Sequence, residues 1–78
     1  MRYDLTIKME TNTMIKHTDN DLIKMRELFM GLKKYRIGES AILMDNTTGE
    51  ILGDYKNNFR AGNYSYTEYI SETLIEGR

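Results

Sequence analysis

Residues 42–54 (ILMDNTTGEILGD) contain the stretch of the sequence that looks most like a ligand-binding motif. An EF-hand loop needs an oxygen ligand at its fifth position, but counting from Asp45 puts Gly49 there. A phosphate-binding loop needs a second glycine five residues after the first, followed by Lys-Ser/Thr. Counting from Gly49, that second glycine position is occupied by Asp54. We therefore interpret the stretch as a turn in which Asp45 or Asn46 hydrogen-bonds nearby backbone and Gly49 adopts a positive φ.

The lone histidine, His17, is followed two residues later by Asp19. In a strand this spacing places both side chains on one face, as a catalytic dyad or half of a metal site would require. Nucleophilic catalysis also needs an activated Ser, Thr or Cys, and zinc needs three or four ligands. The other candidates are scattered carboxylates, so we interpret His17 as a surface histidine and predict no catalytic residue, no metal site and no cofactor.

The remaining carboxylates have explanations other than acid–base catalysis. Asp19 and Asp21 precede an apolar-periodic segment, where a helix N-terminus favours anions. Glu68, Glu72 and Glu76 recur at helical spacing, as either a solvated face or one that meets a basic partner. We expect a protein that is not an enzyme; a small enzyme dependent on His17 is the least favoured alternative.

The composition of the chain limits its possible partners and cellular compartment. The chain has no cysteine, 11 Lys and Arg against 12 Asp and Glu, and a net charge of −1, so no polyanionic or polycationic partner is indicated. The first residues, MRYDLTIKME, lack the apolar run of a signal peptide, and no segment approaches the roughly 20 apolar residues of a membrane span. We expect a cytoplasmic protein in which residues 1–78 form a single α+β domain.

Alternating apolar residues predict a half-buried strand over residues 3–9, and a second strand over residues 14–18. A three-residue loop at residues 11–13 would place Ile7 opposite His17 and keep charged side chains off the buried face. We therefore predict a hairpin at the start of the chain.

A helix is predicted over residues 20–34, with capping side chains at residues 18–21 and cations at residues 33–34 in its last turn. Short apolar runs at residues 40–44 and 50–55 flank the turn described above and predict a second hairpin, with both faces of its strands buried.

Residues 65–76 fit two conformations. Ser65 and Glu68 match a capping box, and apolar residues follow at helical spacing. The content of Tyr, Thr and Ile favours a strand instead, but a strand would place Glu68 on the same face as Tyr66 and Ile70. We predict a helix. The fold is then α+β: an antiparallel sheet of about four strands with two helices, in the chain order β-β-α-β-β-α, the C-terminal helix covering the second face.

Residues 24–36 carry five basic residues and one acidic residue. Ile23 and Met30 lie roughly 100° from the main apolar side of this helix, so they either widen the core or form an exposed apolar strip with a polar rim. Tyrosines are common both at interfaces and at core edges. The predicted partner-binding residues are Ile23, Arg26, Met30, Lys33, Lys34, Arg36, Tyr66 and Tyr69.

These features predict a non-enzymatic protein-binding module that occupies the surface of a protein partner, and an exposed strand edge also allows a homodimer. By analogy of size alone, such a chain suits the inhibitors that phages and mobile elements direct at host or defence machinery, anti-CRISPR proteins included. The alternative is nucleic-acid binding by basic residues interleaved with stacking aromatics. The residues for that alternative are Lys33, Lys34, Arg36, Lys56 and Arg60, with Tyr35, Tyr55 and Phe59.

Overall fold

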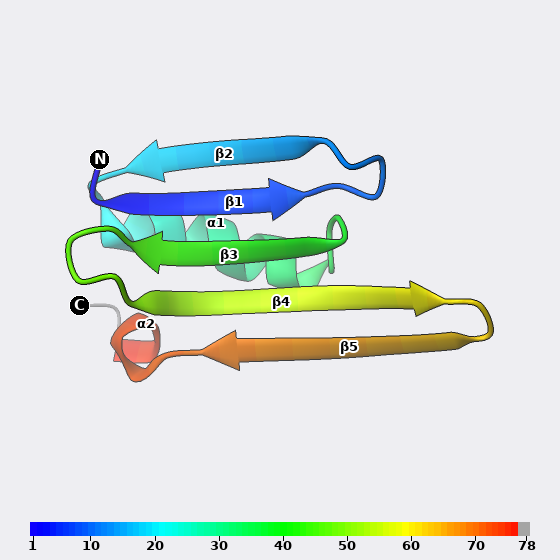
Figure 1. The fold of residues 1–78 in the computed structure, drawn as a ribbon. Coiled ribbons are helices and arrows are strands. Elements are labelled where there is room, and N and C mark those ends of the chain that lie inside the picture. The colour runs from blue at the N-terminus through cyan, green and yellow to red at the C-terminus, as the bar shows by residue number, and fades with distance from the viewer. Residues whose placement is uncertain (77–78) are drawn as a thin grey trace.

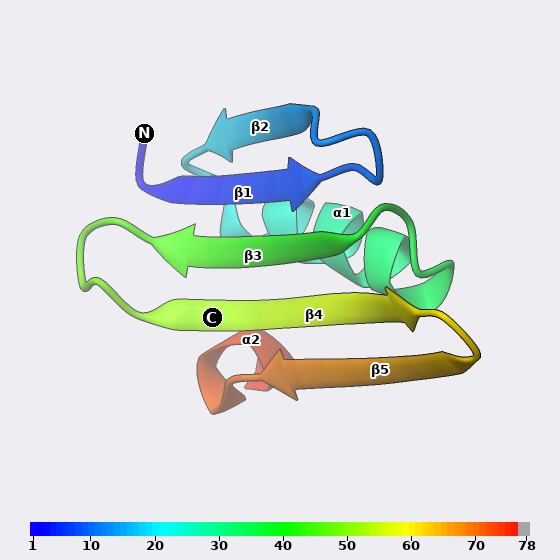
Figure 2. The same ribbon diagram turned by 45° about the vertical axis from the view of Figure 1, so that its right-hand side comes forward.

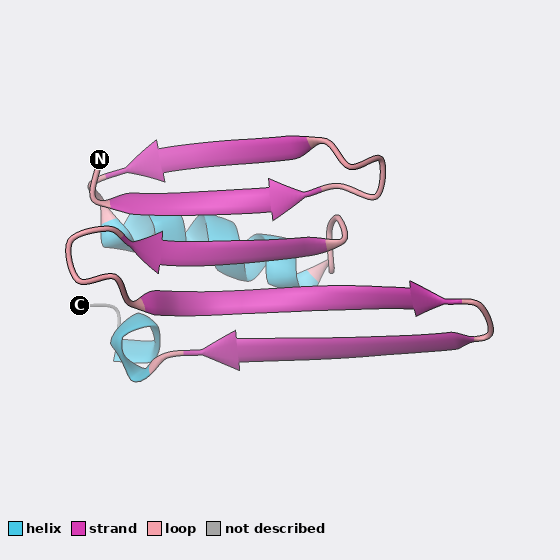
Figure 3. Ribbon diagram, in the orientation of Figure 1, coloured by secondary structure: helices cyan, strands magenta, loops and turns pink. Residues whose placement is uncertain are grey.

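The computed structural model of the protein describes residues 1–76 and shows a five-stranded antiparallel sheet with two helices (Figure 1). The elements in chain order are β1 (Tyr3–Lys8), β2 (Met14–Asp19), α1 (Leu22–Lys34), β3 (Ser40–Asp45), β4 (Ile51–Arg60), β5 (Asn63–Ile70) and α2 (Glu72–Glu76). The strands lie in the order β2-β1-β3-β4-β5. The predicted α+β fold is confirmed, with one strand more than expected (Figure 3).

The first hairpin has a three-residue loop, as predicted, but the loop spans residues 10–12. Asn12 has φ 67° in the last loop position, a left-handed conformation that asparagine tolerates better than most residues. Ile7 therefore lies opposite Ile15, and the predicted pairing of Ile7 with His17 is wrong. The odd-numbered residues of β1 still face the core.

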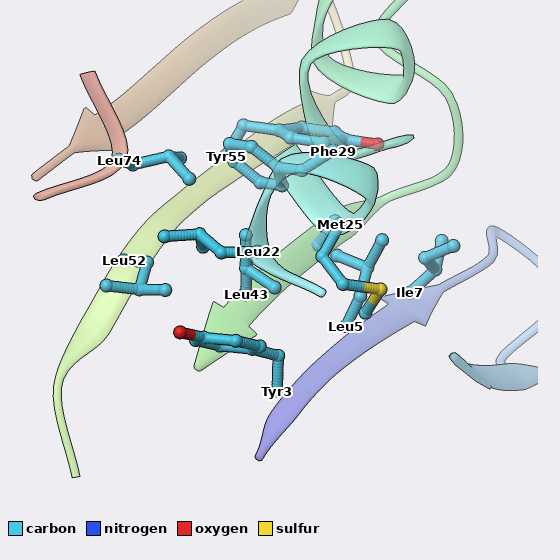
Figure 4. Packing of buried hydrophobic residues seen from close by; sticks show 11 residues of the cluster. Tyr3, Leu5, Ile7, Leu22, Met25, Phe29, Leu43, Leu52, Tyr55 and Leu74 are labelled. Atoms are coloured by element: carbon cyan, nitrogen blue, oxygen red, sulfur yellow. The ribbon is translucent and has the colours of Figure 1, made fainter. Parts of the chain in front are cut away.

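Helix α1 begins at Leu22, two residues after the predicted start at residue 20, and directly after the predicted capping side chains. The carboxylate of Asp21 accepts the backbone N–H groups of Ile23 at 3.0 Å and Lys24 at 3.3 Å, which makes Asp21 the N-cap. Leu22, Met25 and Phe29 are its buried residues. They pack on one face of the sheet, where they meet the buried side chains of β1, β3 and β4 (Figure 4).

Residues 63–70 form strand β5, so the predicted helix over residues 65–76 is wrong for residues 65–70 and correct for residues 72–76, which form α2. In the strand, Glu68 does share a face with Tyr66 and Ile70, which was the reason for preferring a helix. Placing the Glu68 carboxylate on this face costs little free energy, because β5 is an edge strand whose helix-side face is only partly covered. The carboxylate also pairs with Lys33 at 2.9 Å. The β-forming side chains therefore decide the conformation.

The short helix α2 begins after Ser71, whose hydroxyl accepts the N–H of Leu74 at 3.2 Å. It packs on the same face of the sheet as α1, so the predicted cover of the second face is wrong. A β-carbon at Gly53 of β4 would lie 2.8 Å from the Phe29 ring and 3.3 Å from the Leu74 side chain. The missing side chain of Gly53 thus makes room for both helices on one side.

The other face of the sheet is left uncovered by residues 1–76 (Figure 2). One row across it consists of Thr6, Ile42, Asp54 and Tyr69, which are cross-strand partners from β1 to β5. Ile42 and Tyr69 are exposed there, so the expectation that β3 is buried on both faces is wrong. Antiparallel sheets commonly leave one face to water.

Within residues 1–76, neither helix has the length and apolar character needed to cross a bilayer.

Candidate interaction surface

The candidate motif at residues 45–50 is a turn between β3 and β4, as predicted. Gly49 has φ 76° and donates its N–H to the carbonyl of Asp45 at 2.8 Å. The Asp45 carboxylate, whose side chain is 5 % exposed, accepts the N–H of Thr47 at 2.9 Å and the Arg2 guanidinium at 3.0 Å. The oxygens of Asp45 are therefore engaged by the turn and by the N-terminal segment.

This ion pair predicts a pH dependence of stability. The Arg2 hydrogen bonds, with the Thr47 N–H, hold the pKa of Asp45 below its ordinary value of 3.8 although burial opposes this. Because the folded-state pKa is the lower one, the stabilising contribution is complete well above 3.8 and is lost as the pH falls through the folded-state pKa. Asp45→Asn should lower stability at neutral pH and flatten its decline in acid, measured by urea unfolding. An equally steep decline in the variant would contradict this role.

His17 lies exposed on the edge strand β2. The Asp19 carboxylate is engaged elsewhere, because it accepts the N–H of Asp21 at 2.9 Å and pairs with Lys24 at 3.2 Å. In the part of the chain that the structure describes, no three His, Cys, Asp or Glu side chains come close enough together to hold a metal ion.

A row of aromatic rings runs from the core along the β4–β5 hairpin. The ring centroids of Phe29 and Tyr55 are 6.0 Å apart, and those of Tyr55 and Tyr66 are 6.2 Å apart. Further along, Phe59 and Tyr64 are 5.5 Å apart and are 56 % and 50 % exposed. The β4–β5 hairpin extends past the ends of β1 and β3 (Figure 1). Phe59 and Tyr64 lie in this extension, because the pairing of β3 with β4 ends at Lys56. The aromatic row thus passes from the buried core onto an accessible surface.

Arg36 joins this row at the surface. Its guanidinium carbon lies 4.0 Å from the ring centroid of Tyr66 and 5.9 Å from that of Tyr64. Its Nη1 also donates to the Tyr64 hydroxyl at 3.1 Å. Stacking of a guanidinium on a tyrosine ring is an attractive cation–π contact. We refer to Arg36, Phe59, Tyr64 and Tyr66 as the aromatic–arginine surface.

Asn57, which is 1 % exposed, holds the parts of this surface together. Its Nδ2 donates to the backbone carbonyls of Arg36 and Gly38, each at 2.9 Å, and its Oδ1 accepts the Tyr64 hydroxyl at 2.7 Å. Arg36 has φ 50°, an uncommon conformation for a residue other than glycine. The buried amide therefore fixes both a strained backbone segment and the tyrosine that Arg36 contacts.

Basic side chains border the aromatic–arginine surface. Lys33 pairs with Glu68 at 2.9 Å, and the Lys34 ammonium lies 5.5 Å from the ring centroid of Tyr35. Burial, followed by the Glu68 charge, raises the pKa of Tyr66 above its ordinary value of 10.0, so the phenol beneath Arg36 is neutral. Among residues 1–76, no carboxylate forms an ion pair with Arg36. The guanidinium is therefore open to an anion from another molecule.

Three of the eight predicted partner-binding residues, Lys33, Arg36 and Tyr66, come together here. Lys34 is exposed next to them in the chain. Tyr69 is also exposed but lies on the opposite face of the sheet, where its cross-strand partner is Asp54.

The other three predicted residues lie along α1 and do not form one strip. Ile23 is 60 % exposed at the first turn of the helix. Met30 is partly buried and packs against the core. The Arg26 Nε donates to the carbonyl of Leu74 at 2.7 Å, so this side chain fastens α2 to α1.

The residues expected for nucleic-acid binding are divided between two faces. Lys56 alternates with the core-facing residues of β4 and points to the uncovered face, as does Arg60. Lys33 and Arg36 lie on the helix side instead. Tyr55, one of the expected stacking rings, is buried in the core. The structure does not assemble these residues into one basic track.

The predicted partner-binding residues did not include Asn57, Phe59 or Tyr64, although Phe59 was among the stacking rings of the nucleic-acid alternative. One signal could have found them, because a hairpin around the turn at residues 61–62 places Asn57, Phe59, Tyr64 and Tyr66 on a single face by simple alternation.

No protein-family model, no curated protein and no solved structure matches this chain. The function is therefore argued from the geometry of the aromatic–arginine surface itself. That surface offers guanidinium donors and ring faces.

Proposed function

We propose that this protein is a non-enzymatic protein-binding module that occupies a partner's surface with its aromatic–arginine surface. The observation that carries the proposal is the Arg36 guanidinium stacked on Tyr66 beside the exposed rings of Phe59 and Tyr64. Arginine and tyrosine are among the residues that most often dominate the free energy of protein–protein binding. Large rings also contribute contact area at a low cost in conformational entropy.

The preorganisation of these groups supports the same proposal. Asn57 fixes the backbone of Arg36 and the hydroxyl of Tyr64 before any partner arrives. Side chains that are already held in place lose less conformational entropy on binding, so more of their contact energy appears as affinity.

A chain that binds without chemistry suits the inhibitors that phages and mobile elements direct at host or defence machinery. We propose this class as the biological setting, with the cytoplasm as the compartment, because a chain without cysteine does not depend on an oxidising environment.

The test is affinity capture from host-cell lysate with the wild type, Phe59→Ala and Met14→Ala. Phe59 and Met14 are both exposed apolar residues, but Met14 lies on the opposite edge strand β2 and serves as the matched control. We expect one protein to be captured by the wild type and by Met14→Ala, and its affinity for Phe59→Ala to fall about 30-fold, which corresponds to about 2 kcal/mol.

Equal affinity of the captured protein for Phe59→Ala would contradict the proposed surface. Capture of nucleic acid, with an affinity that falls steeply with the logarithm of salt concentration, would favour the nucleic-acid alternative.

A further inference from the structure

Strand β5 is a free edge of the sheet in the part of the chain that the structure describes (Figure 1). It is 8 residues long, contains no proline and carries a single charged residue, Glu68. Proteins usually protect such edges with lysine, proline, a bulge or a short strand. The opposite edge strand, β2, carries Lys16, His17 and Asp19 within 6 residues. The edge of β5 therefore has little protection against pairing with another strand.

The backbone of β5 presents hydrogen-bonding groups at this edge. In β4, the N–H of Asn57 donates to the carbonyl of Glu39 at 2.8 Å, so it points away from β5. Asn57 and Tyr66 are cross-strand partners and must therefore be a non-hydrogen-bonded pair of the antiparallel ladder. The N–H and C=O of Tyr66 consequently point outward, and by alternation so do those of Tyr64 and Glu68.

We propose that a second copy of this chain pairs with this edge, β5 antiparallel to β5, around a twofold axis at Tyr66. This register places Tyr66 opposite its counterpart and Glu68 opposite Tyr64 of the other copy. Direct cross-strand neighbours share a face of the sheet and lie about 5 Å apart at Cβ. The two copies then form one continuous sheet, with the helices of both on the same side.

Charge complementarity is the reason for choosing a second copy as the occupant. Arg36 donates to the Tyr64 hydroxyl at 3.1 Å and has no carboxylate partner among residues 1–76. Glu68 of the second copy, which pairs with Lys33 of its own chain at 2.9 Å, arrives opposite this same Tyr64 and so also meets the guanidinium, twice per dimer. Because Glu68 is the single charge of β5, the strand itself places no like charges opposite each other across the seam. On the uncovered face, Ser65 lies opposite Thr67.

The proposed dimer uses Arg36, Tyr64 and Tyr66 of the aromatic–arginine surface. It is tested separately from the proposed function, because dimerisation is measured on the purified chain alone. Glu68→Lys places two cations together at each of the two contacts, and Arg36→Glu places two carboxylates together there. In an equimolar mixture of the two variants, each contact of a mixed dimer again joins one cation to one carboxylate.

We expect sedimentation equilibrium to show a wild-type dimer and native mass spectrometry to show mixed dimers of the two variants. Each variant alone should have a dimer dissociation constant raised at least about 100-fold, because juxtaposed like charges strongly oppose association. The control Lys16→Glu, on the β2 edge, should dimerise as the wild type does. Circular dichroism verifies folding, and Glu68→Gln, which adds no repulsion, should weaken the dimer by a smaller factor.

Three results would overturn the proposal. The first is a wild type that stays monomeric at every concentration, which would show that β5 of a second copy does not pair with this edge. The second is a dimer that persists unchanged in Glu68→Lys and in Arg36→Glu. The third is a mixture of these folded variants that fails to associate. None of these results depends on whether the aromatic–arginine surface binds another protein.

Discussion

Replacing Phe29 by alanine is expected to lower the free energy of unfolding by about 3–5 kcal/mol. The ring is fully buried, lies directly over Gly53 and contacts Tyr55 with its centroid 6.0 Å away. Its removal leaves a cavity at the point where α1, α2 and β4 meet, and the rigid strand below cannot close it. Because small domains have total stabilities of only about 5–10 kcal/mol, urea unfolding should show a markedly lower midpoint.

Leu28→Ala is the matched control for this prediction. Leu28 is the preceding residue, and the spacing of apolar residues places it on the same side of the helix, yet it is 37 % exposed. Its truncation should cost less than about 1 kcal/mol. Equal losses for the two variants would contradict the orientation of α1 on the sheet.

Replacing Asn57 by leucine is expected to cost about 2–4 kcal/mol, because the side chain keeps its shape but loses three hydrogen bonds. The carbonyls of Arg36 and Gly38 and the hydroxyl of Tyr64 would all lose their partner. The variant should also bind the captured protein more weakly, although Asn57 is itself buried. Urea unfolding measures the first effect, and a binding titration at a temperature where the variant is folded measures the second.

Asn58 provides the comparison. It is the next residue of β4, and its side chain lies on the uncovered face, away from Arg36 and Tyr64. Asn58→Leu should change stability by no more than about 0.5 kcal/mol and leave binding unchanged. If both variants lose the same stability, the buried amide has no special role in holding the surface.

The parts of the fold that could be predicted are those set by neighbours in the chain. Alternation alone identifies β1, because its odd-numbered residues face the core and its even-numbered ones do not. Helix α1 is equally clear, since Asp21 caps it and Lys33 and Lys34 close its last turn. In each case the deciding contacts lie within a few residues, so no knowledge of the sheet is needed.

The conformation of residues 63–70 could not be predicted in this way. Helical spacing and strand propensity compete in this segment, and the outcome depends on its place at the sheet edge. Only there does Glu68 remain accessible and find Lys33, which is 35 positions earlier in the sequence. The position of α2 depends in the same manner on the space above Gly53, which the sequence does not reveal.

The candidate surface was predictable only in part for a related reason. Arg36 and Tyr66 could be selected as interface residue types, but nothing local shows that one stacks on the other. Their common support, Asn57, is 21 residues from Arg36 in the chain. In the sequence, Asn57 is one polar residue among others. Its role depends on the loop at residues 36–38, which packs against the hairpin in the folded protein.

Hydrogen–deuterium exchange of the protein alone and bound to the protein it captures tests most directly whether the aromatic–arginine surface does the binding. Binding should slow amide exchange in residues 34–38 and 57–66 and leave β2 and the first turn of α1 unchanged. Slowed exchange confined to β2 or to that first turn, with no change in residues 34–38 and 57–66, would contradict the proposed function.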